Sequence, residues 1–142
     1  MNRVVIDTNI IVSALMNANG APRQIIRLAL WGEITPFMGN ALLGEYEDVM
    51  SREDILAKSI LDKDEVRDLL NALYASCEWT SVYFLWRPNL QDEADNHLIE
   101  LALAGGTNRI ISANKRDFKH SDLSFPELSI QTAGEFLDER SL

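Results

Sequence analysis

Hydrophobic residues recur along this chain in two patterns, short continuous runs and helical stripes. Val4-Val5-Ile6 is a β-branched run, as expected of a strand that is buried on both faces. Residues 40–50 instead space their apolar side chains three and four positions apart, which is typical of an amphipathic helix. The two patterns alternate, so strands and helices should follow one another along most of the chain.

These patterns and the turn residues between them predict the elements and some of their ends. Asp7-Thr8-Asn9 offers helix N-cap chemistry, Pro22 suits a first helical position, and Gly32 and Gly105-Gly106 end helices. The predicted strands are residues 4–6, 34–37, a segment within 79–85, 109–111 and a short one at 130. The predicted helices are residues 10–15, 22–31, 40–50, 62–77, 92–104 and 133–139.

Strands that alternate with helices favour a parallel sheet covered on both faces. We therefore expect an α/β fold, built as a single domain over residues 1–142. In such sheets ligands bind outside the carboxyl ends of the strands. Polar residues that directly follow a strand are thus the first candidates for function.

Composition and the N-terminal sequence indicate the cellular compartment of the protein. Hydrophobic residues make up 46% and charged residues 25% of the chain, which is ordinary for a globular protein. The N-terminal residues do not form a secretory signal, and no stretch approaches the roughly 18 apolar residues of a membrane helix. Cys77 has no partner for a disulfide, and its apolar neighbours suggest a buried helical thiol. We expect a cytoplasmic protein with no membrane association.

The charge distribution argues against simple phosphate binding. The net charge is −9, whereas proteins that grip nucleic acid through its backbone are usually basic. Any role on nucleic acid must therefore depend on bound cations and on local bases. The best such bases are Lys115, Arg116 and Lys119, although a charge run of this kind is more often a solvated loop.

Two aspartates stand out by their positions. Asp7 directly follows the first strand, although it could instead cap the next helix. Asp95 shares a helix face with Leu98, Ile99 and Ala102, so it should project inward, where an uncompensated carboxylate would be unfavourable. The alternative for Asp95 is a capping arrangement at the helix start.

Further oxygen donors are harder to choose. Glu45 borders the apolar stripe of its helix, but Glu47 lies on the opposite border and is an equal candidate by periodicity. Asn114 and Asp117 follow the strand at 109–111, with loop solvation as the alternative. The smaller polar residues that could support these acids are Thr8, Asn9, Ser13 and Ser112. His97 is offset from the face of Asp95, and we expect it to be a surface histidine.

Carboxylates gathered at one edge repel one another unless a cation lies among them. Oxygen-only ligands favour Mg²⁺ or Mn²⁺, and no EF-hand loop suggests Ca²⁺. Such ions activate water and stabilise charge on a transferring phosphoryl group. The residues therefore predict phosphodiester hydrolysis.

The chain resembles the PIN-domain family, and in particular VapC-type toxin ribonucleases. Four segments carry the resemblance in the family's order, from residue 4 to residue 118. They are VVIDTNIIVSAL (4–15), LLGEYEDV (42–49), DEADNHLI with ALAGG (92–106) and IISANKRDF (110–118).

The resemblance implies a three-layer α/β/α sandwich with a mostly parallel sheet of about five strands. It also implies a metal-dependent endoribonuclease that cleaves single-stranded RNA, with Asp7, Glu45 and Asp95 as metal ligands. The fourth position departs from the most acidic form of the pattern, because it is Asn114 with Asp117 three residues later. This departure puts a second metal ion in doubt.

A toxin of this kind would have an antitoxin protein as partner, and helix 62–77 could serve a homodimer. Two other functions stay open. The chain could be a PIN-like module that binds RNA or protein with little or no cleavage, or another Mg²⁺-dependent phosphoryl hydrolase.

Overall fold

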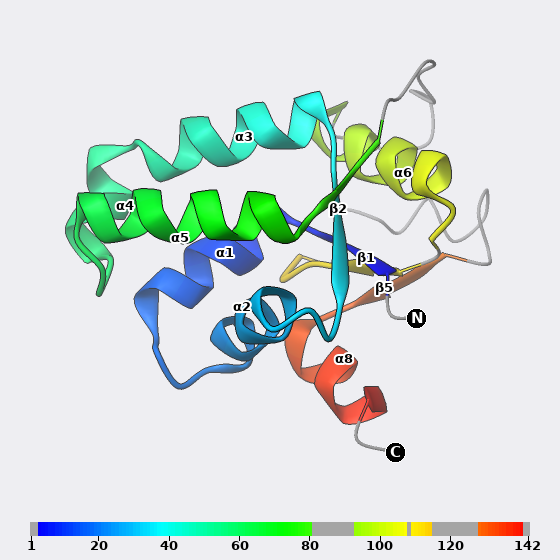
Figure 1. Cartoon of the computed structure of the whole chain (residues 1–142), viewed down its shortest axis with the longest axis horizontal. Helices are drawn as coiled ribbons and strands as arrows, with labels where there is room; N and C mark the ends of the chain where they lie inside the picture. The colour runs from blue at the N-terminus through cyan, green and yellow to red at the C-terminus, as the bar shows by residue number, and fades with distance from the viewer. Residues whose placement is uncertain (1–2, 81–92, 108, 115–127, 141–142) are drawn as a thin grey trace.

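The computed structural model describes residues 3–80, 93–107, 109–114 and 128–140, without the side chains of residues 93–96 (Figure 1). Its strands are β1 Arg3–Ile6, β2 Thr35–Met38, β3 Glu78–Trp79, β4 Arg109–Ile111 and β5 Ser129–Gln131. Its helices are α1 Thr8–Met16, α2 Ala21–Leu30, α3 Asn40–Met50, α4 Glu53–Lys58, α5 Lys63–Ser76, α6 Glu93–Gly105 and α8 Ala133–Arg140.

The strands form one five-stranded sheet in the order β3-β2-β1-β4-β5, and each neighbouring pair is parallel. β1 is the central strand, with Val4 opposite Pro36 of β2 and Val5 opposite Ile110 of β4. The predicted parallel sheet of about five strands is confirmed. The carboxyl ends of β1 and β4 therefore lie side by side.

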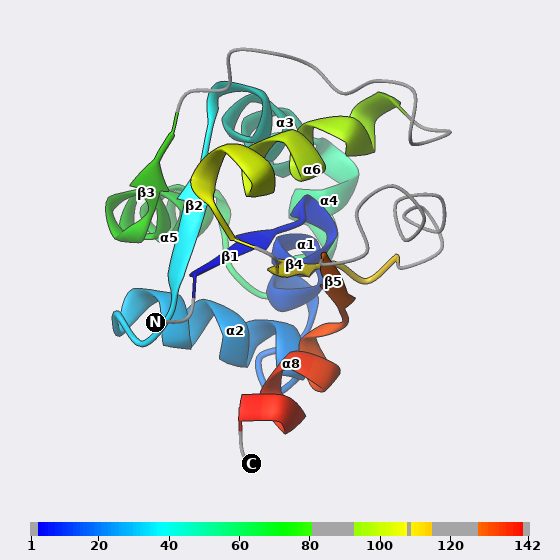
Figure 2. The same cartoon turned by 90° about the vertical axis from the view of Figure 1, so that its right-hand side faces the viewer.

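Helices cover both faces of this sheet. Figure 2 shows α6 on one side of β1 and β4, and α2 with α8 on the opposite side. The central strand lies between these layers, and Val4, Val5 and Ile6 are fully buried. This explains why β1 reads as a continuous apolar run, because neither of its faces meets water.

Local signals set several element ends. Asp62 and Glu65 form a reciprocal capping box at the start of α5. Gly106 follows α6 with a φ of +74°, a conformation that glycine adopts without strain and that commonly ends a helix. Both ends lie within one or two residues of the predicted ones.

The short helix α4 was not predicted. It has six residues and no fully buried side chain, so it shows no apolar stripe. Its acids Glu53 and Asp54 in the first turn and Lys58 in the last complement the helix dipole. That charge pattern was the available signal.

The strand expected within 79–85 is described only as Glu78–Trp79, since residues 81–92 lie outside the described part. Among the described residues, no helix is both long enough and apolar enough to span a membrane.

Candidate functional site

Asp7 lies where the two central strands end. It is the residue between β1 and α1, and its backbone N–H donates to the carbonyl of Ile111 in β4 at 2.9 Å. Although Asp7 is the N-cap residue of α1, its side chain makes no capping hydrogen bond. The carboxylate therefore does not serve the capping role that the sequence left open, and is directed to other partners.

Those partners come from both strand ends. Oδ2 of Asp7 accepts a hydrogen bond from Ser112 Oγ at 2.6 Å and one from Asn9 Nδ2 at 3.2 Å. Asn9 Oδ1 in turn accepts from the backbone N–H of Ala113 at 3.0 Å. Ser112 and Asn9 thus hold Asp7 in one orientation and tie the start of α1 to the end of β4.

Glu45 reaches the same edge from α3. Its Oε1 accepts a hydrogen bond from the hydroxyl of Thr8, the residue that follows Asp7. Its Oε2 lies 2.9 Å from Nε2 of His97 on α6. Two carboxylates that are 38 positions apart in the sequence are therefore linked through Thr8, the first residue of α1, which directly follows Asp7.

The electrostatics of the two carboxylates differ. Burial raises the pKa of Asp7, and the charge of Glu45 raises it further, against the lowering effect of the Ser112 hydrogen bond. The hydrogen bond from His97 is the main cause of a lowered pKa at Glu45, with Thr8 acting in the same direction. Glu45 is thus held ionised beside a buried carboxyl that resists ionisation. A cation between them would stabilise both as carboxylates.

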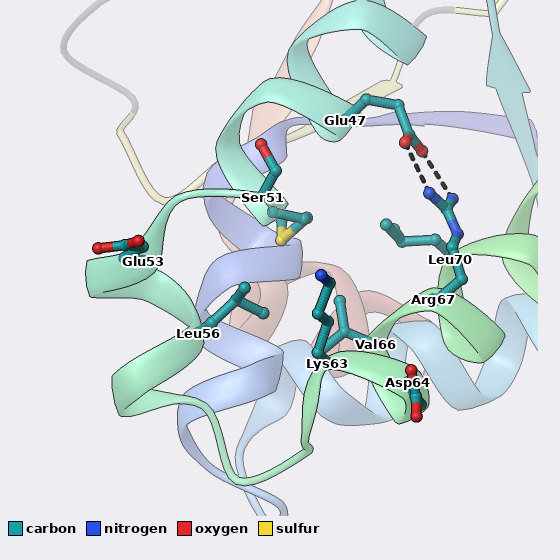
Figure 3. Close-up of a pocket in the computed structure, with 10 residues that line it drawn as sticks. Glu47, Ser51, Glu53, Leu56, Lys63, Asp64, Val66, Arg67 and Leu70 are labelled. Atoms are coloured by element: carbon teal, nitrogen blue, oxygen red, sulfur yellow. Dashed lines mark hydrogen bonds and ion pairs between the residues drawn. The ribbon is translucent and has the colours of Figure 1, made fainter.

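The structure separates Glu45 from Glu47, which periodicity alone could not do. Glu47 accepts two hydrogen bonds of 2.7 Å from Arg67 and one of 2.5 Å from Tyr74, both on α5. Arg67 is the main cause of its pKa of about 2. Figure 3 shows this pair at the rim of a groove of about 510 Å³ between α3, α4 and α5. Neither Asp7 nor Glu45 lines that groove.

Of the predicted site residues, Asp95 is described only in part and Asp117 is not described. Asp95 is the third residue of α6, and its side chain lies outside the described residues, as does the whole of Asp117. The backbone of Asp95 is two positions before His97, so the first turns of α6 lie at the edge that Glu45 occupies. Asn114 is exposed, and its backbone N–H donates to Ser112 Oγ at 3.1 Å. The phosphate-binding candidates Lys115, Arg116 and Lys119 also lie outside the described part.

The expectation that His97 is a surface histidine is wrong. Its side chain is 17% exposed and contacts Glu45. The periodicity of α6 placed His97 away from the face of Asp95, but it could not show that α3 covers that flank. His97 and Glu45 are 52 positions apart, so the local sequence around either residue does not indicate their contact.

The donor set suits a hard divalent ion. Carboxylate and hydroxyl oxygens from Asp7, Glu45, Thr8 and Ser112 gather here, and oxygen donors favour Mg²⁺ or Mn²⁺. Within the described side chains, no three acidic, histidine or cysteine groups form a complete metal cluster. The third predicted ligand, Asp95, is not among those side chains. The described side chains therefore include two of the three predicted ligands, Asp7 and Glu45.

Comparison with known proteins gives one family match and one relative. The PIN domain family matches residues 3–116. The chain is also 28% identical over 148 aligned residues to the uncharacterized protein MJ1680 of Methanocaldococcus jannaschii. That alignment covers 96% of this chain and 90% of the relative.

Proposed function

We propose that this chain, which belongs to the PIN domain family, is a metal-dependent endoribonuclease that hydrolyses single-stranded RNA. PIN domains are generally nucleases that use divalent metals. The observation that carries the proposal is the linked pair of Asp7 and Glu45 at the carboxyl ends of the central strands. Burial, and to a lesser extent the charge of Glu45, raise the pKa of the Asp7 carboxyl. Such a buried pair of carboxyls is poorly explained by stability and well explained by a bound cation.

In this proposal Asp7, Glu45 and Asp95 hold Mg²⁺ or Mn²⁺. The bound ion would activate water and neutralise charge that develops on the phosphoryl group, which leads to 5′-phosphate and 3′-hydroxyl ends. Ser112 and Asn9 orient the carboxylate that Asp7 would present to the ion. Asn114 or Asp117 would orient water or support a weaker second ion.

We extend the proposal to its biological setting. The chain would act in the cytoplasm on single-stranded RNA, as the toxin of a toxin–antitoxin pair, and would form a homodimer. The support for these points is the family resemblance of its four motifs. A small antitoxin protein encoded by a neighbouring reading frame would be its partner.

The test is cleavage of an unstructured, end-labelled RNA in Mn²⁺ and in chelator. Wild type should cleave only with the ion. Asp7→Asn and Asp95→Asn should each lower the cleavage rate by about 100-fold or more, because each removes a charged ligand. Glu47→Gln is the matched control, since it neutralises an acid on the same helix as Glu45 that is bound to Arg67 instead. Its rate should stay within about twofold of wild type.

The outcomes separate the competing functions. Unchanged metal-dependent cleavage by Asp7→Asn would show that the site is wrong. RNA retained on a filter without cleavage would favour a binding module. Release of phosphate from a small monoester, with intact RNA, would favour another phosphoryl hydrolase.

A further inference from the structure

We propose that His97 is a positioning residue that, together with Thr8, fixes the carboxylate of Glu45 for metal binding. The inference rests on the proposed function and adds to it a residue that belongs to none of the predicted ligands. It starts from one contact, the 2.9 Å separation of His97 Nε2 and Glu45 Oε2.

The two donors to Glu45 come from two different helices. Thr8 of α1 donates to Oε1, and His97 of α6 donates to Oε2. A carboxylate only accepts hydrogen bonds, so Nε2 of His97 carries the proton in this contact. Both oxygens of Glu45 are therefore engaged, each by a different element.

This arrangement matters because glutamate is flexible. The side chain of Glu45 is 29% exposed, and a free glutamate loses considerable rotamer entropy when a ligand orders it. Donors on both oxygens order it in advance. The side chain of Glu45 then loses less entropy when metal binds, which is the general benefit of residues that hydrogen-bond to metal ligands and orient them.

The positions of the donors in the sequence give the contact its meaning. Thr8 directly follows Asp7, so its hydrogen bond sets the placement of Glu45 relative to Asp7. His97 follows Asp95 by two residues on α6, so its contact sets the placement of Glu45 relative to the start of that helix. The two donors thus fix the position of Glu45 relative to the parts of the chain that carry the other two predicted ligands, Asp7 and Asp95.

A plain stabilising contact would have a different signature from a positioning one. A stabilising contact changes the unfolding temperature and leaves metal affinity unchanged. A positioning contact changes metal affinity even where the unfolding temperature is preserved. The length of the replacing side chain separates them further, because only a donor that reaches Glu45 can substitute for His97.

The experiment is calorimetric titration of full-length protein with Mn²⁺, in the absence of RNA. His97→Gln and His97→Asn form a matched pair with the same amide group. The longer glutamine should reach Glu45, and the shorter asparagine should not. We expect His97→Asn and His97→Ala to bind Mn²⁺ about 10-fold more weakly than wild type, with His97→Gln within about threefold. Thermal unfolding without metal shows which variants are folded.

Several results would overturn the inference. One is a folded His97→Asn variant that binds Mn²⁺ as tightly as wild type. Another is a His97→Gln variant that binds Mn²⁺ as weakly as His97→Asn. The third is a loss of Mn²⁺ affinity in the His97 variants as large as that in Asp7→Asn. The last of these would make His97 a ligand. If His97→Ala does not fold, the matched amide pair decides alone.

A failure of the proposed function can be distinguished from a failure of this inference. Wild type that neither cleaves RNA nor binds Mn²⁺ through Asp7 would refute the nuclease and, with it, any positioning of Glu45 for metal. Wild type that cleaves through Asp7, with Mn²⁺ affinity insensitive to residue 97, would refute only the role of His97.

Discussion

At the scale of single residues, the buried position of Asp7 disfavours the ionised carboxylate that metal binding would require. The residue is 6% exposed, and burial disfavours its ionised form. Ser112 and Asn9 compensate in part by donating to Oδ2. A buried carboxyl of raised pKa stabilises the fold while it is protonated, below its usual value of 3.8. That stabilisation is lost as the pH rises through the raised pKa.

Neutralising Asp7 should therefore stabilise the metal-free protein. At pH 7 we expect Asp7→Asn to unfold about 4 °C higher than wild type, the shift that about 1 kcal/mol produces in a chain of this size. The difference should shrink as the pH falls toward 4, because the wild-type carboxyl then takes up its proton. Calorimetric scans in chelator at several pH values measure it. A wild type that is more stable than Asp7→Asn at pH 7 would contradict this account.

At the scale of elements, α3 is held from two sides so that Glu45 faces the site. The hydroxyl of Tyr46, which is fully buried, donates to the carbonyl of Ile6 in β1 at 2.6 Å. Glu47 binds Arg67 and Tyr74 of α5. Three consecutive residues of α3 therefore serve three different neighbours: the site, the sheet and α5.

The contact between α3 and α5 should contribute to stability without contributing to catalysis. Arg67→Ala should lower the free energy of unfolding by about 1 kcal/mol at pH 7, since the pair is partly exposed and screened by solvent. Glu47 has a lowered pKa, so its contribution is present above the unfolded value of 4.5 and is lost as the pH falls toward about 2. Urea unfolding at pH 7 and pH 3 should show the gap between variant and wild type narrowing. RNA cleavage should stay within about twofold of wild type, and a large loss would mean that α3 is held mainly by this contact.

At the scale of the whole molecule, the site joins parts of the chain that would otherwise be independent. Asp7 and Ser112 lie at the ends of two strands, and Glu45 and His97 come from helices α3 and α6. An ion bound among them links these elements only in the folded state. By mass action, such an ion stabilises the fold.

Mn²⁺ should therefore raise the unfolding temperature of wild type. At an ion concentration about 100-fold above the dissociation constant, the gain is about 2.7 kcal/mol. Asp7→Asn should show no such gain, and NaCl at matched ionic strength should produce none in either protein. Equal shifts in both proteins would indicate that the ion screens the net charge of −9 and binds elsewhere.

Much of this protein could be predicted from local patterns. Apolar runs, helical periodicity and turn residues predicted β1, β2, β4 and β5 and every described helix except α4, because these patterns report which face of an element is buried. β3 overlaps the predicted segment 79–85 only at Trp79. The apolar run Val4-Val5-Ile6 also predicted that Asp7 lies at the carboxyl end of a strand. The alternation of strands with helices predicted the parallel sheet, and the four family motifs added its size of about five strands.

The sequence alone thus determined the order of the elements, the family and the position of Asp7 at a strand end. Periodicity left Glu45 and Glu47 as equal candidates, and the family resemblance favoured Glu45. The tertiary structure decided how Glu45 reaches that end, and that His97 is partly buried in contact with it. Hydrogen bonds such as Ser112 to Asp7 and His97 to Glu45 join residues 105 and 52 positions apart. Side-chain pairing across such distances depends on how helices pack on the sheet, and a periodic pattern within one element carries no record of its neighbours.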